Sequence, residues 1–131
     1  MDAYTTHGAF SWSEPMTSDP QAALAFYRQL FGWTVDVMPM PQGDYHVVKA
    51  GDTAVGGIMK MPPEAAAGGM PPCWGVYVTV DDVDACAARV GALGGKVLHP
   101  PTDIPGVGRF STLQDPQGAV FNVIAYVDNP Q

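Results

Sequence analysis

The sequence predicts an α+β fold in which two βαβββ modules form a curved mixed sheet around a central cleft. Short strand-like stretches follow each of two helical stretches, and each helical stretch begins at an Asp and ends at a Gly. Gly32 lies thirteen positions after Asp19, Gly95 lies thirteen positions after Asp82, and the two copies lie sixty-three positions apart. This repeated spacing indicates two copies of one unit, whose sheets are expected to pack side by side.

Module one is expected at residues 9–61. Residues 10–16 alternate large and small side chains, which predicts the first strand. Asp19 and Pro20 suit the N-cap and first position of a helix that continues to Phe31 and ends at Gly32. Three strands should follow, because β-rich stretches separated by Pro and Gly occupy residues 33–38, 45–50 and 54–60.

Module two is expected at residues 74–127, after a connection at residues 62–73 that is rich in Pro, Ala, Gly and Met. Its helix should begin at the cap Asp82, continue through Leu93 and end at Gly94 and Gly95. A loop is predicted from His99 to Gly108, and the expected strands are residues 74–80, 96–98, 109–114 and 119–125.

The last two strands meet at the sequence Asp115-Pro116-Gln117-Gly118, which is typical of a tight turn. The strand that follows is apolar except for Asn122 in its middle. A buried amide needs hydrogen-bond partners or a ligand, so Asn122 is a candidate for the functional site.

Composition narrows the possible partners and location. The chain has 131 residues, 47% of them apolar, and a net charge of −7 that argues against nucleic acid or an anionic membrane as partner. No leader or membrane-spanning stretch is evident, so a cytoplasmic location is expected. Cys73 and Cys86 match neither a zinc pair nor a redox motif and are expected to be free thiols.

These features together resemble the vicinal oxygen chelate superfamily, also called the glyoxalase/bleomycin-resistance/dioxygenase fold. The matching pieces are Asp19-Pro20, Phe31-Gly32-Trp33, Val80-Asp81-Asp82, Leu93-Gly94-Gly95 and Asp115-Pro116-Gln117-Gly118. Gly8-x-Phe10-x-Trp12-x-Glu14 and the segment from Pro105 to Phe110 are similar to a bacterial glyoxalase-like subgroup often found as a tandem protein. The resemblance implies one glyoxalase-like domain over residues 1–131 and a possible homodimer.

Metal-dependent members of this family carry His, Glu or Gln ligands at four inward strand positions. The resemblance places these positions at Trp12, Gly57, Gly75 and Asn122, of which only Asn122 offers a polar side chain, and a neutral amide is a poor ligand by itself. We therefore expect no metal and no cofactor. The three histidines, His7, His46 and His99, have no metal-ligand spacing.

If those four positions face inward, the two-residue period of a strand brings further residues to the same side. They are Glu14, Met16, Met59, Tyr77, Thr79, Val120 and Ile124. This mixture of aromatic, thioether and polar groups suits an amphipathic small molecule. The residues predicted to bind it are Trp12, Met59, Tyr77, Thr79, Arg109 and Asn122.

Two residues are candidates for catalysis. A Glu14 carboxylate enclosed by apolar groups would suit a general base, or it could accept hydrogen bonds and do no chemistry. His46 on a middle strand could assist it or could be a packed residue. Arg109 could bind a ligand carboxylate or phosphate, or it could pair with one of the many acids.

Three classes of function fit these observations. The first is a metal-independent protein that binds or sequesters a small amphipathic or aromatic molecule, as the drug-sequestering members of the family do. The second is a metal-independent lyase, isomerase or cyclase with Glu14 as general base. The third is an accessory subunit with a vestigial cleft, whose edge strands pair with another chain.

Overall fold

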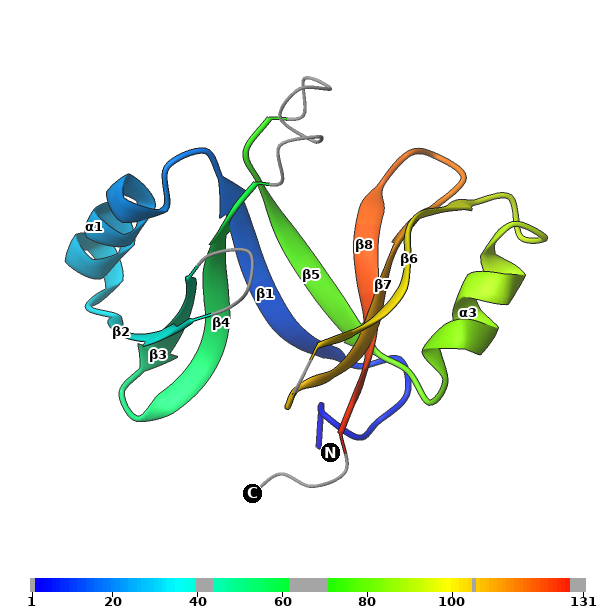
Figure 1. Cartoon of the computed structure of the whole chain (residues 1–131), viewed down its shortest axis with the longest axis horizontal. Coiled ribbons are helices and arrows are strands. Elements are labelled where there is room, and N and C mark those ends of the chain that lie inside the picture. The colour runs from blue at the N-terminus through cyan, green and yellow to red at the C-terminus, as the bar shows by residue number, and fades with distance from the viewer. Residues whose placement is uncertain (1, 40–43, 62–70, 105, 128–131) are drawn as a thin grey trace. The chain divides into compact units, whose positions relative to one another are not determined.

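The computed structural model describes residues 2–39, 44–61, 71–104 and 106–127. The element order is βαβββ written twice, as Figure 1 shows. The elements are β1 (Phe10–Thr17), α1 (Pro20–Phe31), β2 (Thr34–Met38), β3 (Tyr45–Ala50), β4 (Thr53–Lys60), β5 (Cys73–Thr79), α3 (Val83–Val90), β6 (Lys96–Ile104), β7 (Gly108–Gln114) and β8 (Val120–Tyr126). Most of the predicted connection, residues 62–70, lies outside the described residues.

The chain divides into two compact units. The α1 unit is Ser13–Gly75, and the α3 unit combines Met1–Trp12 with Val76–Gln131. Within the α3 unit the start of the chain is joined to β5, because the Thr79 amide donates to the Ala9 carbonyl at 2.8 Å. The strands of the mixed eight-stranded sheet follow the order β2-β3-β4-β1-β5-β8-β7-β6.

The α1 unit packs one helix on one face of its strands. Asp19 caps α1 by accepting a hydrogen bond from the Ala22 amide at 3.1 Å, and the helix ends at Gly32 in the left-handed conformation, with φ 74°. Leu24 of α1 packs on Val48 of β3 and Ile58 of β4. These contacts identify the face of the strands that α1 covers.

The α3 unit repeats this arrangement. Asp82 caps α3 by accepting from the Ala85 amide at 3.0 Å. Val83 of α3 packs with Val80, Leu113 and Val123 to form the core. The α+β class, the two βαβββ modules and the mixed sheet are therefore as predicted, and the central cleft stays a prediction.

The second helix is shorter than predicted. α3 ends at Val90 rather than continuing through Leu93. Leu93 is 62% exposed and gains nothing from helical packing, while Gly91 directly after the helix weakens its continuation. The chain instead turns, and the Gly95 amide donates to the Val90 carbonyl at 2.9 Å. Between Asp82 and Gly95 this copy therefore contains a shorter helix followed by a turn, although the spacing equals that between Asp19 and Gly32.

The strand β6 is longer than predicted, because it continues through Pro100 and Pro101 to Ile104 instead of giving way to a loop at His99. Its pairing with β7 shifts register on both sides of His99. β6 is the last strand in the sheet order and has a strand neighbour on one side only. Proline has no backbone amide to donate, and an edge strand tolerates this because one of its sides pairs with no strand of this sheet.

Both cysteines, Cys73 and Cys86, are free, as predicted. Burial raises the pKa of the Cys86 thiol, which keeps this side chain protonated and unreactive at neutral pH. Among the described residues, no helix combines the length and apolar character needed to cross a membrane.

Candidate functional site

A row of polar side chains crosses the four strands of the α3 unit on the face opposite α3. Tyr77 of β5 pairs with Asn122 of β8, Asn122 pairs with Thr112 of β7, and Thr112 pairs with His99 of β6. Directly paired residues point to the same side of a sheet. Since Leu113 and Val123 pack in the core with α3, the neighbouring Thr112 and Asn122 point away from it. We call Tyr77, Asn122, Thr112 and His99 the amide row.

Asn122 is the centre of this row. It is 8% exposed, its Oδ1 accepts a hydrogen bond from the Thr112 hydroxyl at 2.6 Å, and its Nδ2 donates to the Val76 carbonyl at 3.2 Å. An amide can make up to four hydrogen bonds, so these two leave capacity for a ligand. The two bonds also hold the side chain in one orientation.

Aromatic rings lie beside the amide row. The His99 imidazole stacks on the Phe110 ring with ring centres 5.2 Å apart. The Phe110 ring is tilted against the Tyr77 ring, with ring centres 6.4 Å apart. Phe110 precedes Thr112 by two residues and therefore shares its face. This face of the α3 unit combines flat apolar rings with oriented hydrogen-bonding groups, as small-molecule sites do.

Thr79 lies on the same strand face as Tyr77, but the start of the chain occupies its hydroxyl. Thr79 is 3% exposed and donates to the Ala3 carbonyl at 2.6 Å. At the end of β8, the Tyr126 and Ser11 hydroxyls form a hydrogen bond of 2.7 Å, and burial raises the pKa of Tyr126 to about 12. The Tyr126 phenol therefore stays protonated at neutral pH.

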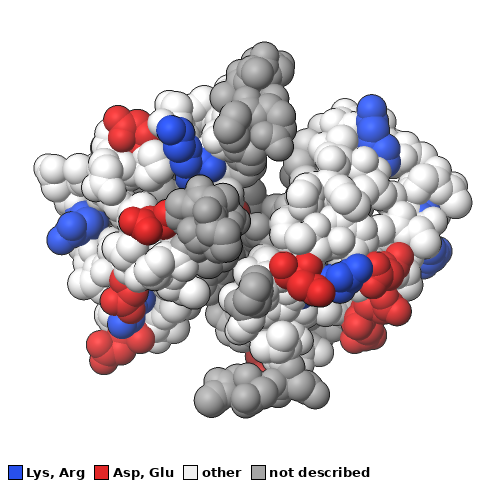
Figure 2. Space-filling view, in the orientation of Figure 1, with Lys and Arg blue, Asp and Glu red and all other residues white. Residues whose placement is uncertain are grey.

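Arg109 lies on the other face of β7, toward α3. Its Nε and Nη2 donate to the two Asp84 oxygens at 3.0 Å each, and its Nη1 donates to Asp103 at 3.0 Å. These bonds lower the pKa of Asp84 and raise that of Arg109. Figure 2 shows acidic side chains at several separate places on the viewed face rather than in one patch. The structure thus gives Arg109 acidic partners and does not bring it together with Asn122.

The Asp84–Arg109 pair gives a pH-dependent prediction. Because Arg109 lowers the Asp84 pKa below its ordinary value of 3.8, the pair stabilises the fold at higher pH and stops doing so as pH falls through the lowered pKa. Asp84→Asn should therefore cause a small loss of stability at pH 6 that shrinks toward pH 3, measured as urea midpoints. Asp52→Asn in an exposed turn is the control, and an Asp84→Asn deficit equal at both pH values would contradict the prediction.

In the α1 unit, the predicted residues Glu14 and Met59 lie on the face of the strands away from α1. Met16 pairs with Met59 and Ser13 with Gly56 in the parallel β1–β4 ladder, which places Glu14 beside Gly57. Glu14 is 6% exposed, unusually buried for a carboxylate. Trp12, two residues before Glu14 on β1, belongs to the α3 unit and is half-buried.

His46 lies on the opposite face, which α1 covers. It pairs directly with Ile58 and shares its strand face with Val48, two residues further along β3, and both Ile58 and Val48 pack on Leu24 of α1. His46 is 6% exposed, and its Nδ1 is buried with no hydrogen-bond partner among the described residues. The structure does not bring His46 together with Met59.

The four positions where the resemblance implies metal ligands do not fit a divalent cation. Trp12 has an indole, Gly57 and Gly75 have no side chain, and the Asn122 oxygen already accepts from Thr112. The space over Gly57 is also filled, because a Cβ added there would collide with the Tyr45 hydroxyl. Within the described parts of the chain, no three His, Cys, Asp or Glu side chains converge.

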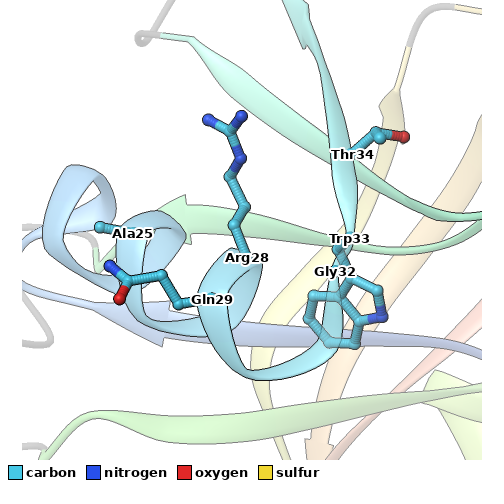
Figure 3. Close-up of a pocket in the computed structure, with 6 residues that line it drawn as sticks. All are labelled: Ala25, Arg28, Gln29, Gly32, Trp33 and Thr34. Atoms are coloured by element: carbon cyan, nitrogen blue, oxygen red, sulfur yellow. The ribbon is translucent and has the colours of Figure 1, made fainter.

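An open depression of about 520 Å³ lies elsewhere, where α1 meets β2 (Figure 3). It is lined by Ala25, Arg28, Gln29, Gly32, Trp33 and Thr34, and Figure 3 shows Arg28 and Gln29 extending from the last turns of the helix. None of the predicted site residues lies there, and its polar side chains do not converge as in a ligand site. We therefore base the candidate site on the strand faces.

Sequence reasoning missed Thr112, Phe110 and Tyr45. Counting outward from the predicted strand ends, Gln114 and Ala119, would place Thr112 opposite Phe121. In the structure Gln114 pairs with Val120 instead, which places Thr112 opposite Asn122 and Phe110 opposite Ile124. Tyr45 was missed because a register shift interrupts its strand pair.

Several known proteins are similar to this chain. "Putative glyoxylase CFP32" of Mycobacterium tuberculosis is 48% identical over 118 residues, which are 89% of this chain and 44% of CFP32. The anthracycline biosynthesis protein DnrV of Streptomyces peucetius is 35% identical over 127 residues, covering 88% of this chain and 46% of DnrV. The chain therefore spans less than half the length of these curated relatives.

Solved structures share the fold at low sequence identity. Hypothetical protein BH1468 of Bacillus halodurans superposes with a TM-score of 0.72 at 9% identity, over 96% of this chain and 99% of its own. Methylmalonyl-CoA epimerase of Mycobacterium tuberculosis gives a TM-score of 0.67 at 13% identity, over 94% and 91%. The model of the Glyoxalase/Bleomycin resistance protein/Dioxygenase superfamily matches residues 14–123, and the chain belongs to this superfamily.

Proposed function

We propose that this protein binds a small amphipathic or aromatic organic molecule, without a metal ion, on the strand face of the α3 unit that lies opposite α3. The observation that carries the proposal is the amide row beside Phe110: a held amide, hydroxyls and an imidazole next to flat rings. The rings would cover the apolar part of the ligand, and Asn122 would orient a carbonyl or hydroxyl group.

The relatives support this class of ligand. DnrV is named for anthracycline biosynthesis, and an anthracycline is a flat polycyclic molecule with carbonyl and hydroxyl groups. A methylmalonyl-CoA epimerase with the same fold has been solved in complex with methylmalonyl-CoA, which also combines carbonyl groups with an aromatic base. Both molecules combine a flat ring system with oxygen groups.

Thermal stabilisation by ligands tests the proposal, because a molecule that binds the native state raises its Tm. The panel is daunorubicin, bleomycin and methylmalonyl-CoA. A panel molecule that binds, at a concentration about 100 times its Kd, should add about 2.7 kcal/mol to the free energy of unfolding and raise Tm by several degrees. Thr112→Val should reduce the shift, because it removes the hydroxyl that holds Asn122. Thr53→Val is the matched control, since Thr53 is exposed at the start of β4 in the α1 unit.

Two results would count against this function. One is that no flat, oxygen-bearing molecule in the panel changes Tm. The other is a stoichiometric transition metal in the purified protein whose removal by a chelator abolishes the ligand shift.

The burial of Glu14 favours a second candidate, a metal-independent lyase, isomerase or cyclase with Glu14 as general base. A buried carboxylate could remove a proton from carbon in a molecule that binds on the strand face of the α1 unit. Glu14→Gln separates the two functions: lost turnover with retained ligand binding supports the enzyme, whereas absence of turnover in the wild-type protein on every bound ligand supports the binding protein.

A further inference from the structure

A bulge in the edge strand β6 brings His99 and Thr102 to one side of the sheet. Residues three positions apart on a regular strand point to opposite faces. Here His99 pairs with Thr112 and Thr102 pairs with Phe110, although Thr112 and Phe110 are only two positions apart on β7. The extra residue in β6 lies in the two prolines between His99 and Thr102. Both side chains therefore lie on the face of the amide row.

Hydrogen bonds hold this bulge in place. The Ser111 hydroxyl, which is fully buried, donates to the His99 carbonyl at 2.7 Å. The Thr102 hydroxyl donates to the Pro100 carbonyl at 2.9 Å and lies 3.1 Å from the His99 Nε2 atom. Bulges next to functional sites often change the direction of a side chain. Together with the stacking on Phe110, these bonds hold the His99 imidazole in one place.

The hydrogen bonds of Thr102 decide which nitrogen of the neutral His99 ring carries the proton. A threonine hydroxyl has a single proton, and Thr102 donates it to the Pro100 carbonyl, which cannot donate in return. The Thr102 oxygen can then only accept from Nε2, so Nε2 carries the ring proton and Nδ1 keeps its lone pair. Nδ1 makes no hydrogen bond with any described residue. The bulge thus presents an oriented acceptor on the face of the amide row.

We infer that the His99 Nδ1 atom accepts a hydrogen bond from a hydroxyl group of the ligand. His99 and Thr102 are exposed, so a molecule on this face can reach the ring. The stacked His99 and Phe110 rings give a flat ligand an apolar surface beside the acceptor. The tautomer of His99 does not depend on the proposed function, whereas the contact with a ligand rests on it.

The position of Asn122 narrows the class of ligand further. Asn122 donates one of its two Nδ2 protons to the Val76 carbonyl, which leaves the other for a carbonyl group of the ligand. Asn122 and His99 both pair with Thr112, so one strand separates them, and two strand spacings amount to about 10 Å. The ligand class is therefore a flat molecule with a hydroxyl group at one end and a carbonyl group at the other.

Nitrogen-15 NMR of the ligand-free protein tests the tautomer. At high pH the His99 Nε2 should give the signal of a protonated ring nitrogen, and Nδ1 that of an unprotonated one. Thr102→Val removes the acceptor, so both tautomers should be populated and the two signals should move toward each other. Thr53→Val, the same change at an exposed position of β4, should leave both signals in place. A proton on Nδ1 in the wild-type protein, or signals unchanged by Thr102→Val, would overturn the inference.

Two matched probe molecules test the contact with a ligand. O-desmethylnabumetone is a flat naphthalene with a hydroxyl group at one end and a ketone on a short chain at the other. Nabumetone has a methyl ether in place of the hydroxyl group and cannot donate there. The wild-type protein should bind the hydroxyl probe about tenfold more tightly, which corresponds to about 1.4 kcal/mol. His99→Phe keeps a flat ring beside Phe110 but has no acceptor, so this preference should disappear.

The outcomes separate this inference from the proposed function. If the wild-type protein binds both probes equally or binds neither, or if the preference persists in His99→Phe, the hydroxyl contact at His99 is wrong. The proposed function would then still stand on any panel molecule that raises Tm. If no panel molecule binds either, the proposed function is wrong as well, and only the tautomer measured in the ligand-free protein remains.

Discussion

Gly56→Ala is expected to destabilise the protein much more than Gly57→Ala, although the two glycines are neighbours on one strand. A Cβ at position 56 would collide with the backbone carbonyl oxygen of Ser13, which belongs to the paired strand β1. A backbone cannot move aside without breaking the parallel ladder. We expect a loss of about 3 kcal/mol, the upper part of the range for overpacked sites, and a Tm lower by about 10 °C.

Gly57→Ala meets only a side chain, since the colliding atoms belong to the Tyr45 ring. A ring at the end of a side chain can rotate away, so the expected loss is about 1 kcal/mol. Thermal unfolding of both variants beside Gly91→Ala, where nothing lies within 4 Å of an added Cβ, measures the difference. Equal losses for Gly56→Ala and Gly57→Ala would show that the β1–β4 ladder is not packed as described.

Local features of the fold could be predicted from the sequence because they depend on neighbouring residues. Asp19 and Asp82 cap their helices through amides three residues ahead. Asp115 accepts from the amides of Gln117 and Ala119, and Gly118 adopts φ 101°, as the turn sequence predicts. The face assignment of Tyr77 and Asn122 followed from the two-residue period of a strand. All of these need only short-range chemistry.

Features that depend on strand register could not be predicted in the same way. Counting outward from the turn between Ala50 and Thr53 would pair His46 with Gly57. The register shift at Val48 and Lys49 pairs His46 with Ile58 instead, on the α1 side. One extra residue in the ladder thus places His46, which was predicted to assist Glu14 or to be packed, on the α1 side, and it places Tyr45 on the face of Glu14.

The partners of Arg109 could not be predicted from the sequence for a different reason. Its charge and position at a strand start are visible in the sequence, but thirteen acids compete as partners. The choice of Asp84 and Asp103 depends on how α3 packs on β7 and how β6 pairs beside it. Packing between elements of this kind is not encoded in any short motif.

Asn122→Asp should destabilise the protein strongly at neutral pH and hardly at all in acid. An ionised carboxylate at this site could still accept from the Thr112 hydroxyl, but it could not donate to the Val76 carbonyl, which would instead repel it. For a side chain that is 8% exposed, we expect a loss of about 2–4 kcal/mol at pH 8.

The pH dependence has a definite sign. Burial and the facing carbonyl should raise the pKa of the introduced carboxyl group above its unfolded value of about 3.9, so the loss should grow as pH rises from 3.9 and become constant above the folded pKa. Below 3.9 the neutral acid can donate to Val76 and accept from Thr112, as the amide does. Urea unfolding of Asn122→Asp from pH 3.5 to pH 8 measures this dependence against Gln117→Glu, which makes the same charge change at an exposed turn. A constant loss across that range would mean that Asn122 matters for its shape rather than for its two hydrogen bonds, and the amide row would lose its anchor.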